Sequence, residues 1–456
     1  MLAALLRKKP ITPVHSETEL HRSLSAFDLT LMGIGAIIGA GVFVLTGIAA
    51  ATKAGPAIVI SYFIAGLASM FAALAYAELA ASIGGSGSAY SYAYIGFGEF
   101  IAWIIGWNLL LEYIMSVGTV AIGWSGYVNN LFQAMNIYLP DAITKNPFEG
   151  GVINLLAVLI IFLLAVLLCV GVKQSARFNA AIVFIKLLTI AIFIAVASVN
   201  IDIKNWENFL PFGWSGVMQG AALVFFAYIG FDALSTTVEE AIEPQRSIPI
   251  GILLSLVICT TIYIVVAALL TAIVPYTILN VESPVADALL KIGYHSVAGI
   301  IAAGAIAGLT TVMLVVFYGL TRICLAMSRD GLLPVSIGNI NSKTRTPITI
   351  ILITATLIAC IAGFVPIHKA AELVNIGTLA AFTFVCGGVI IFRATHPDLE
   401  RPFKLPFSPY VPILGMIFCI YLMFNLSVDA WWRFGIWSVI GIVLYFAYGY
   451  RHSVLE

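Results

Sequence analysis

Long apolar segments alternate with short polar connections along almost the whole chain. Each apolar segment has roughly 20 residues, enough for a helix to cross the ~30 Å hydrocarbon core of a bilayer. This pattern predicts an all-α polytopic membrane protein with about twelve transmembrane helices. The expected spans are residues 28–50, 57–80, 97–125, 152–170, 178–199, 216–238, 249–273, 297–327, 347–365, 372–392, 410–427 and 434–450.

The composition indicates the same class of protein. Of 456 residues, 61% are apolar and 10% are charged, so polar side chains are too few to cover a soluble domain of this length. Basic and acidic residues balance at 22 each, so no basic face indicates a nucleic-acid partner. The six cysteines are scattered through apolar segments, where we expect them to pack as small hydrophobic residues.

The sequence shows no motif of enzymatic chemistry. It contains neither a Walker phosphate-binding loop nor an H-E-x-x-H zinc motif, and its acidic and histidine residues do not cluster near an interface. We therefore expect a protein that is not an enzyme and that uses no cofactor and no metal.

The basic residues indicate how the chain crosses the membrane. With a cytoplasmic N-terminus, the inward-facing tails and connections hold 15 Lys and Arg residues, whereas the outward-facing connections hold 6. This bias predicts that both termini are cytoplasmic. Residues 1–27 and 451–456 are then cytoplasmic tails of a multi-pass protein, which we expect in the cell membrane.

Two charged residues fall deep within expected spans. Lys186 lies about 14 Å beyond Arg177 along a helix, too deep for its ammonium to reach the interface easily. Glu112 lies midway along the third span. Ionisable residues at this depth mark functional sites by default, although a tilted helix for Lys186 and an interhelical hydrogen bond for Glu112 are alternatives. Because burial disfavours the charged form, Lys186 is a candidate for binding and releasing a proton.

Glycines interrupt two spans at corresponding positions. The first span contains GIGAIIGAGVF from Gly33 to Phe43, and the sixth contains FFAYIGFD from Phe225 to Asp232. Paired interruptions five spans apart indicate an inverted repeat with a binding site at the midplane. Helix packing through Gly35-x-x-x-Gly39 is an alternative, and residues 304–308 hold a second such motif, but packing alone does not require a partner interruption.

Backbone groups freed at such breaks suggest the chemistry of a ligand. At membrane depth, a broken helix is tolerated where its free groups line a cavity or meet a ligand. Backbone N–H groups at a helix N-terminus suit a carboxylate, and carbonyls at a helix C-terminus suit an ammonium. An α-amino acid carries both groups on one carbon and fits this arrangement.

Four stretches in order along the chain resemble the amino acid–polyamine–organocation (APC) superfamily, and within it bacterial relatives of the cationic amino acid transporter family. They are FDLTLMGIGAIIGAGVFVLTG, SARFNAAIVFIK, FFAYIGFDALSTTVEEAIEPQRSIPIGI and LTRICLAMSRDGLLP. The resemblance implies a 5+5 inverted repeat with broken helices 1 and 6, plus two C-terminal helices. The repeats are expected at residues 28–199 and 216–392, and the additional helices at 410–450.

Where residues match, the resemblance implies a substrate site. Backbone amides of the first break would meet the substrate carboxylate, and carbonyls of both breaks would meet its ammonium. Phe226 matches an aromatic residue that closes over bound substrate on the outer side. The implied substrate-binding residues are Ile37, Ile38, Gly39, Ala40, Gly41, Phe226, Ala227, Tyr228, Ile229 and Val316.

The resemblance also implies residues for proton coupling. Lys186 matches a lysine that, in proton-coupled members, stands where sodium-coupled relatives bind sodium against the first and eighth spans. Its ammonium would mimic a bound cation, and loss of its proton would loosen that tie. Glu112 matches a third-span glutamate linked to the site through water or the first helix. The implied function is a proton-coupled amino acid symporter that works by alternating access.

The expected substrates are neutral and apolar amino acids such as alanine, branched-chain amino acids and methionine. The eighth span reads TTVMLVVFYG around Val316, which is apolar where a cationic substrate would need a polar residue. Since one methylene is worth only about 1–3 kcal/mol of discrimination, related amino acids should share the site. Transport of arginine or lysine and amino acid exchange are the alternatives, and the short tails disfavour a nutrient sensor.

The connection between spans three and four bears on protein partners. Some superfamily relatives form a disulfide with a single-span heavy chain through a cysteine in this connection. Residues 127–151 contain no cysteine, so we expect no disulfide-linked heavy chain. The expected partners are the amino acid substrate, protons and the lipid bilayer.

Overall fold

The computed structural model describes residues 7–9, 24–83, 88–170, 176–344 and 346–454. Most of the expected N-terminal tail, at residues 1–6 and 10–23, and residues 455–456 of the C-terminal tail lie outside this set. The described chain is helical and contains no β-strand, so the predicted all-α class is confirmed. The longer α-helices are α2 (Ala26–Ile37), α4 (Ile58–Ser82), α5 (Ser88–Gly96), α6 (Glu99–Ala134), α8 (Leu155–Val170), α9 (Ala176–Ser198), α10 (Gly213–Val224), α11 (Pro244–Ile273), α12 (Pro284–Lys291), α13 (His295–Arg329), α14 (Ile348–Phe364), α15 (Ile367–Thr395), α16 (Tyr410–Phe424) and α17 (Val428–Leu444).

The helices correspond to the expected membrane spans. Within the described chain, eight helical stretches are long and apolar enough to cross a bilayer, and α2, α8, α14 and α16 are shorter apolar helices. Together they cover all twelve expected segments. Short turns of α-helix also form α3 (Thr46–Ala49), α7 (Asp141–Thr144) and α18 (Tyr450–His452).

Several elements differ from the sequence prediction. Helix α6 runs 36 residues, beyond the expected end at residue 125, because its last turns continue into the polar segment containing Asn129 and Asn130. Helix α5 and helix α12 were not expected. Both lie in connections and are too short to produce a hydropathy signal of their own.

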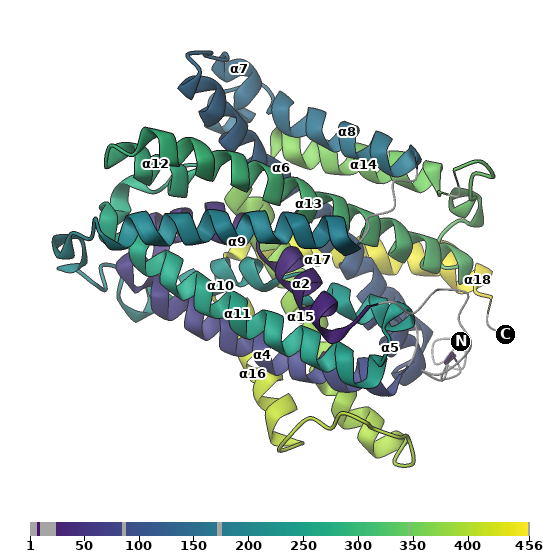
Figure 1. Ribbon diagram of the computed structural model, residues 1–456. Coiled ribbons are helices and arrows are strands. Elements are labelled where there is room, and N and C mark those ends of the chain that lie inside the picture. Colours follow the sequence, from purple (N-terminus) through teal and green to yellow (C-terminus); the bar gives the residue numbers. More distant parts are fainter. Residues whose placement is uncertain (1–6, 10–23, 84–87, 171–175, 345, 455–456) are drawn as a thin grey trace.

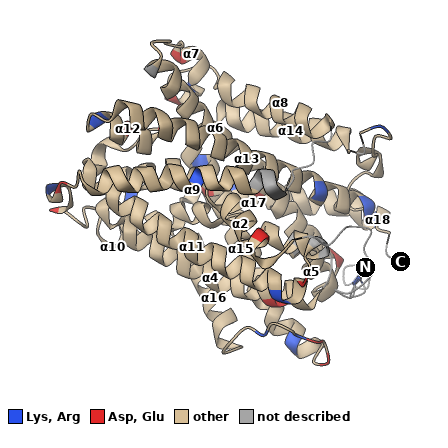
Figure 2. Ribbon diagram, in the orientation of Figure 1, with Lys and Arg blue, Asp and Glu red and all other residues tan. Residues whose placement is uncertain are grey.

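Long helices packed lengthwise form one bundle (Figure 1). Helix α6 packs along α13, α4 packs along α11, and α8 lies beside α14. Charged residues gather toward the ends of the helices, and few occur along their middle (Figure 2). This distribution fits a bundle whose middle lies in hydrocarbon, because a charged side chain is costly there.

The two ends of the described chain meet at the end of α13. The Lys9 ammonium lies 2.6 Å from the Asp330 carboxylate, and the Val454 backbone N–H donates to the Asp330 carbonyl at 3.1 Å. Both ends therefore lie on the same side of the bundle, as an even number of crossings requires.

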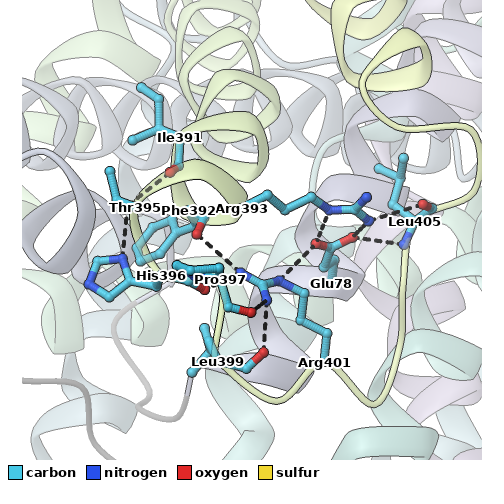
Figure 3. Close-up of polar contacts among 10 residues, drawn as sticks. All are labelled: Glu78, Ile391, Phe392, Arg393, Thr395, His396, Pro397, Leu399, Arg401 and Leu405. Atoms are coloured by element: carbon cyan, nitrogen blue, oxygen red, sulfur yellow. Dashed lines mark hydrogen bonds and ion pairs between the residues drawn. The ribbon is translucent and has the colours of Figure 1, made fainter.

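A partly buried ion cluster joins the end of α4 to the end of α15 (Figure 3). The Glu78 carboxylate accepts two hydrogen bonds from the Arg393 guanidinium, at 2.8 and 2.6 Å, and one from the Leu405 backbone N–H at 2.7 Å. Arg401 lies 3.7 Å from the same carboxylate and also donates to four backbone carbonyls. We refer to Glu78, Arg393, Arg401 and Leu405 as the Glu78 cluster. It fixes the segment after α15 against α4.

Candidate functional site

The first predicted helix break is present. Helix α2 ends at Ile37, and Ile38 has extended backbone angles of φ −72° and ψ 103°. The chain becomes helical again at Ala40 and continues into a π-helical turn, Gly41–Leu45. The interruption lies in the middle of the bundle, where the glycine pattern places it.

The second predicted break lies in the sixth span. Helix α10 ends at Val224, a 3₁₀ turn follows over Phe225–Tyr228, and Ile229 is extended. Gly230 then adopts φ +116°, a conformation that disfavours L side chains, and a Cβ there would lie 2.9 Å from the Ala36 carbonyl oxygen. The Asp232 carboxylate accepts a hydrogen bond from the Gly230 N–H at 3.2 Å.

The two breaks are in direct backbone contact. A Cβ added to Gly41 would lie 2.3 Å from the Ala227 Cβ and 2.4 Å from its Cα. No side chain fits at this position, which explains a glycine that helix packing alone would not require. The two interrupted helices therefore form one structural unit.

A small cavity lies between the breaks and helices α6 and α13. Its volume is about 20 Å³, room for a water-sized group. Seven of the ten residues predicted to bind substrate line it: Ile37, Gly39, Ala40, Gly41, Phe226, Ile229 and Val316.

The other three predicted residues lie outside the cavity lining. The Ile38 N–H donates to the Ile34 carbonyl at 2.9 Å, and its own carbonyl accepts from Lys186. The Ala227 carbonyl accepts from the Tyr263 hydroxyl at 2.9 Å, and the Tyr228 hydroxyl donates to the Tyr62 carbonyl at 2.7 Å. These four polar groups thus have partners within the protein.

Sequence reasoning missed four lining residues: Ala36, Ser116, Val120 and Val312. Three of them carried a signal in helical spacing. Ser116 and Val120 follow Glu112 at intervals of four residues on α6, and Val312 precedes Val316 by four on α13. The cavity wall facing the breaks is therefore two short stripes of side chains, mostly apolar.

Lys186 projects from α9 into the first break. Its ammonium donates to the Gly35 carbonyl at 2.8 Å and to the Ile38 carbonyl at 3.2 Å, and its side chain is fully buried. A Cβ on Gly308 would lie 2.9 Å from the Lys186 Cε, and one on Gly304 would lie 2.1 Å from the Thr189 hydroxyl oxygen. The glycine motif of the eighth span therefore lets α9 approach α13 and accommodates this lysine.

Glu112 lies in a second buried polar group near the sixth-span break. Its side chain is 1% exposed, and among the described residues its Oε1 has no hydrogen-bond partner. Asp232 is close enough for the two carboxyl groups to interact electrostatically, and it accepts from the Tyr113 hydroxyl at 3.3 Å. Glu112 does not line the cavity, so any influence on a ligand there passes through its neighbours.

The structure thus has two broken helices in backbone contact and a buried lysine that donates to carbonyls of the first. Comparison with known proteins identifies the family. The model of the amino acid permease family matches residues 24–445. The chain belongs to this family. The family lies within the APC superfamily that the sequence motifs resemble, so that prediction is confirmed. The helical bundle and the family together identify a multi-pass membrane protein and an amino acid transporter.

Individual relatives are similar along their full length. The chain is 46% identical to the methylthioribose transporter of Bacillus subtilis and 46% identical to the branched-chain amino acid permease BcaP of the same organism, with 100% of both chains covered in each case. It is 30% identical to human cationic amino acid transporter 4, over 98% of this chain and 90% of that protein. The permease is thus more similar to the two bacterial transporters than to this cationic one.

Proposed function

We propose that the permease is a proton-coupled symporter for small neutral and apolar amino acids in the cell membrane, with both termini in the cytoplasm. The observation that carries this proposal is the junction of the two breaks. Residues of both interrupted helices line a small cavity, and the buried Lys186 ammonium donates to two carbonyls at the first break beside it. Such a junction suits a zwitterion whose binding is linked to protonation.

The cavity wall favours apolar substrates. Phe226, Val120, Val312 and Val316 line it, and Ser116 contributes its one side-chain hydroxyl. The buried acid Glu112 is not part of the wall, so no lining carboxylate faces a distal positive charge. Similarity to a branched-chain amino acid permease supports the same preference.

Protonation of Lys186 supplies the proposed coupling. As an ammonium, Lys186 ties α9 to the two carbonyls at the end of α2. A neutral amine has fewer hydrogens to donate and no charge, so deprotonation weakens this tie and frees the first half-helix to move. Glu112, next to the sixth-span break, is the second group proposed to respond to protons.

Methylthioribose is a second candidate substrate. The relative named for its transport is as similar as the branched-chain permease, and the Ser116 hydroxyl offers a polar group that a sugar hydroxyl would use. Transport of arginine or lysine is a third possibility, supported by the more distant relative.

Uptake into proteoliposomes tests the proposal. Labelled alanine, leucine, arginine and methylthioribose are compared with and without an inward proton gradient. We expect gradient-driven accumulation of alanine and leucine. Efficient arginine uptake without leucine uptake contradicts the specificity, accumulation of methylthioribose alone favours the second candidate, and stimulation by internal amino acid without a gradient effect indicates an exchanger.

A further inference from the structure

Three buried tyrosines pack behind the junction of the two breaks. The rings of Tyr62, Tyr228 and Tyr263 lie within 5.4 to 6.4 Å of one another, centroid to centroid. Each has no exposed surface. They come from α4, the sixth-span break and α11, so this tyrosine cluster joins three segments that are far apart in sequence.

Tyr263 is distinguished by what its hydroxyl contacts. The oxygen lies 2.8 Å from the Ile37 carbonyl and 2.9 Å from the Ala227 carbonyl. One carbonyl belongs to the end of α2 and the other to the 3₁₀ turn of the sixth-span break. A single side chain therefore holds the carbonyl ends of both interrupted helices.

One hydroxyl hydrogen cannot fully satisfy two carbonyl acceptors. A tyrosine hydroxyl has one proton to donate, so at any moment one of these carbonyls lacks a full hydrogen bond from it. Carbonyls at the ends of helices carry partial negative charge, which low-dielectric surroundings leave poorly screened. The Ile37 and Ala227 carbonyls are held close together and keep a negative potential. This arrangement favours binding of a cationic group.

We infer that Tyr263 is a positioning residue for the substrate ammonium. Its hydroxyl keeps the Ile37 and Ala227 carbonyls converging at the junction, and its proton turns to one carbonyl when the ammonium engages the other. This inference rests on the proposed function, because it concerns the α-amino group of an amino acid. It adds a residue outside the described cavity lining, and the hydrogen bonds described for the Lys186 ammonium go to the Gly35 and Ile38 carbonyls instead.

A positioning role for Tyr263 predicts a change in ligand preference that a purely structural role does not predict. Positioned carbonyls favour an ammonium over a neutral hydroxyl at the α-carbon. The analogue 2-hydroxyisocaproate is leucine with a hydroxyl in place of the amine. The carbonyls therefore set the ratio between the affinity for leucine and the affinity for this analogue. Damage to packing lowers both affinities alike and leaves this ratio unchanged.

Tyr263→Phe tests the inference, because it removes the hydroxyl and keeps the ring in the tyrosine cluster. Affinities of the purified full-length protein for both ligands are measured by a binding assay in detergent. We expect the leucine preference to fall about three- to tenfold, the effect of losing one hydrogen bond's contribution to recognition. Tyr127→Phe is the matched control, since it removes an equally buried hydroxyl that donates to the Phe43 carbonyl at 2.6 Å, and its ratio should stay at the wild-type value.

The outcomes distinguish failure of the role of Tyr263 from failure of the proposed function. A ratio unchanged or increased in Tyr263→Phe, with leucine still bound by the wild type, overturns the role of Tyr263 and leaves the proposed function intact. Wild-type protein that binds no amino acid overturns the proposed function and this inference with it. A Tyr263→Phe chain that does not elute as a single folded species shows that the hydroxyl serves folding, which also contradicts a role specific to the ammonium.

Discussion

Glu78 and Glu112 are both buried carboxylates, with exposed fractions of 2% and 1%, but their surroundings differ. The Glu78 carboxylate accepts three hydrogen bonds and has two guanidinium groups beside it. In the described part of the chain, one Glu112 oxygen has no hydrogen-bond partner. Pairing with guanidinium groups compensates the cost of burying charge at the first site, whereas the described residues provide no ion pair for the second carboxyl group. The surroundings of Glu78 therefore favour a stabilising role, and those of Glu112 favour a change of protonation.

Lys186 belongs with Glu112 in this comparison. Its ammonium has neutral carbonyl partners, so its charge is solvated by dipoles without an opposite charge in contact. Burial of such a charge costs free energy, and ionisable residues within membrane spans usually have a function. The comparison predicts that substitutions at the midplane affect transport first and that substitutions in the Glu78 cluster affect stability first.

Lys186→Met provides the largest expected effect on transport. Removal of the ammonium should abolish gradient-driven uptake of leucine in proteoliposomes, because the proton-dependent tie to α2 is lost. The melting temperature should be unchanged or higher, since an apolar side chain of similar length replaces a buried charge. Full activity in this variant contradicts the proposed coupling.

Arg393→Met provides the largest expected effect on stability. It leaves the Glu78 carboxylate without its two shortest guanidinium bonds, a change that costs about 3 kcal/mol for a buried pair broken on one side. We expect a clearly lower melting temperature, with leucine affinity retained in the folded fraction. Arg322→Gln is the control, because Arg322 is exposed and its guanidinium donates to the hydroxyl of the nearby Tyr318 and lies over its ring. Equal melting temperatures for both variants would contradict a stabilising role of the Glu78 cluster.

Glu112→Gln tests the midplane acid with a smaller change. Glutamine keeps the shape of the side chain and cannot lose a proton, so gradient-driven uptake should fall about a hundredfold, the lower end of the range for a single proton-transfer group. The melting temperature should stay close to that of the wild type. Destabilisation as large as that of Arg393→Met, with transport unaffected, would assign Glu112 to the structural class.

Glu282 offers the mildest test, in a connection outside the spans. It packs against Gly126 of α6, and burial together with the nearby Glu149 carboxylate raises the pKa of Glu282 to about 8. Between about pH 4.5 and pH 8 the unfolded chain releases this proton while the folded chain keeps it, so stability falls as pH rises through this range. Glu282→Gln should remove this part of the pH dependence, measured as melting temperature against pH. An unchanged slope contradicts a protonated Glu282 in the folded protein.

Local sequence features predicted both breaks and the depth of Lys186. Only glycine fits the backbone contact of Gly41 with Ala227, and the positive φ of Gly230 disfavours any other residue. Such constraints are visible in the sequence because they determine the residue type. The Glu78 cluster joins residues more than 300 positions apart, and Tyr263 resembles any other aromatic residue of an apolar helix. Pairing between distant helices depends on packing, which hydropathy and spacing do not specify.

The backbone contact between Gly41 and Ala227 separates two tasks in one site. Under the proposed function, main-chain atoms at the breaks bind the carboxylate and ammonium that every amino acid has, while side chains on α6 and α13 contact the part that differs from one substrate to the next. Ser116, Val120, Val312 and Val316 can therefore change during evolution without disturbing the shared part. Redesign of substrate preference in this permease should begin with those four positions and leave the glycines alone.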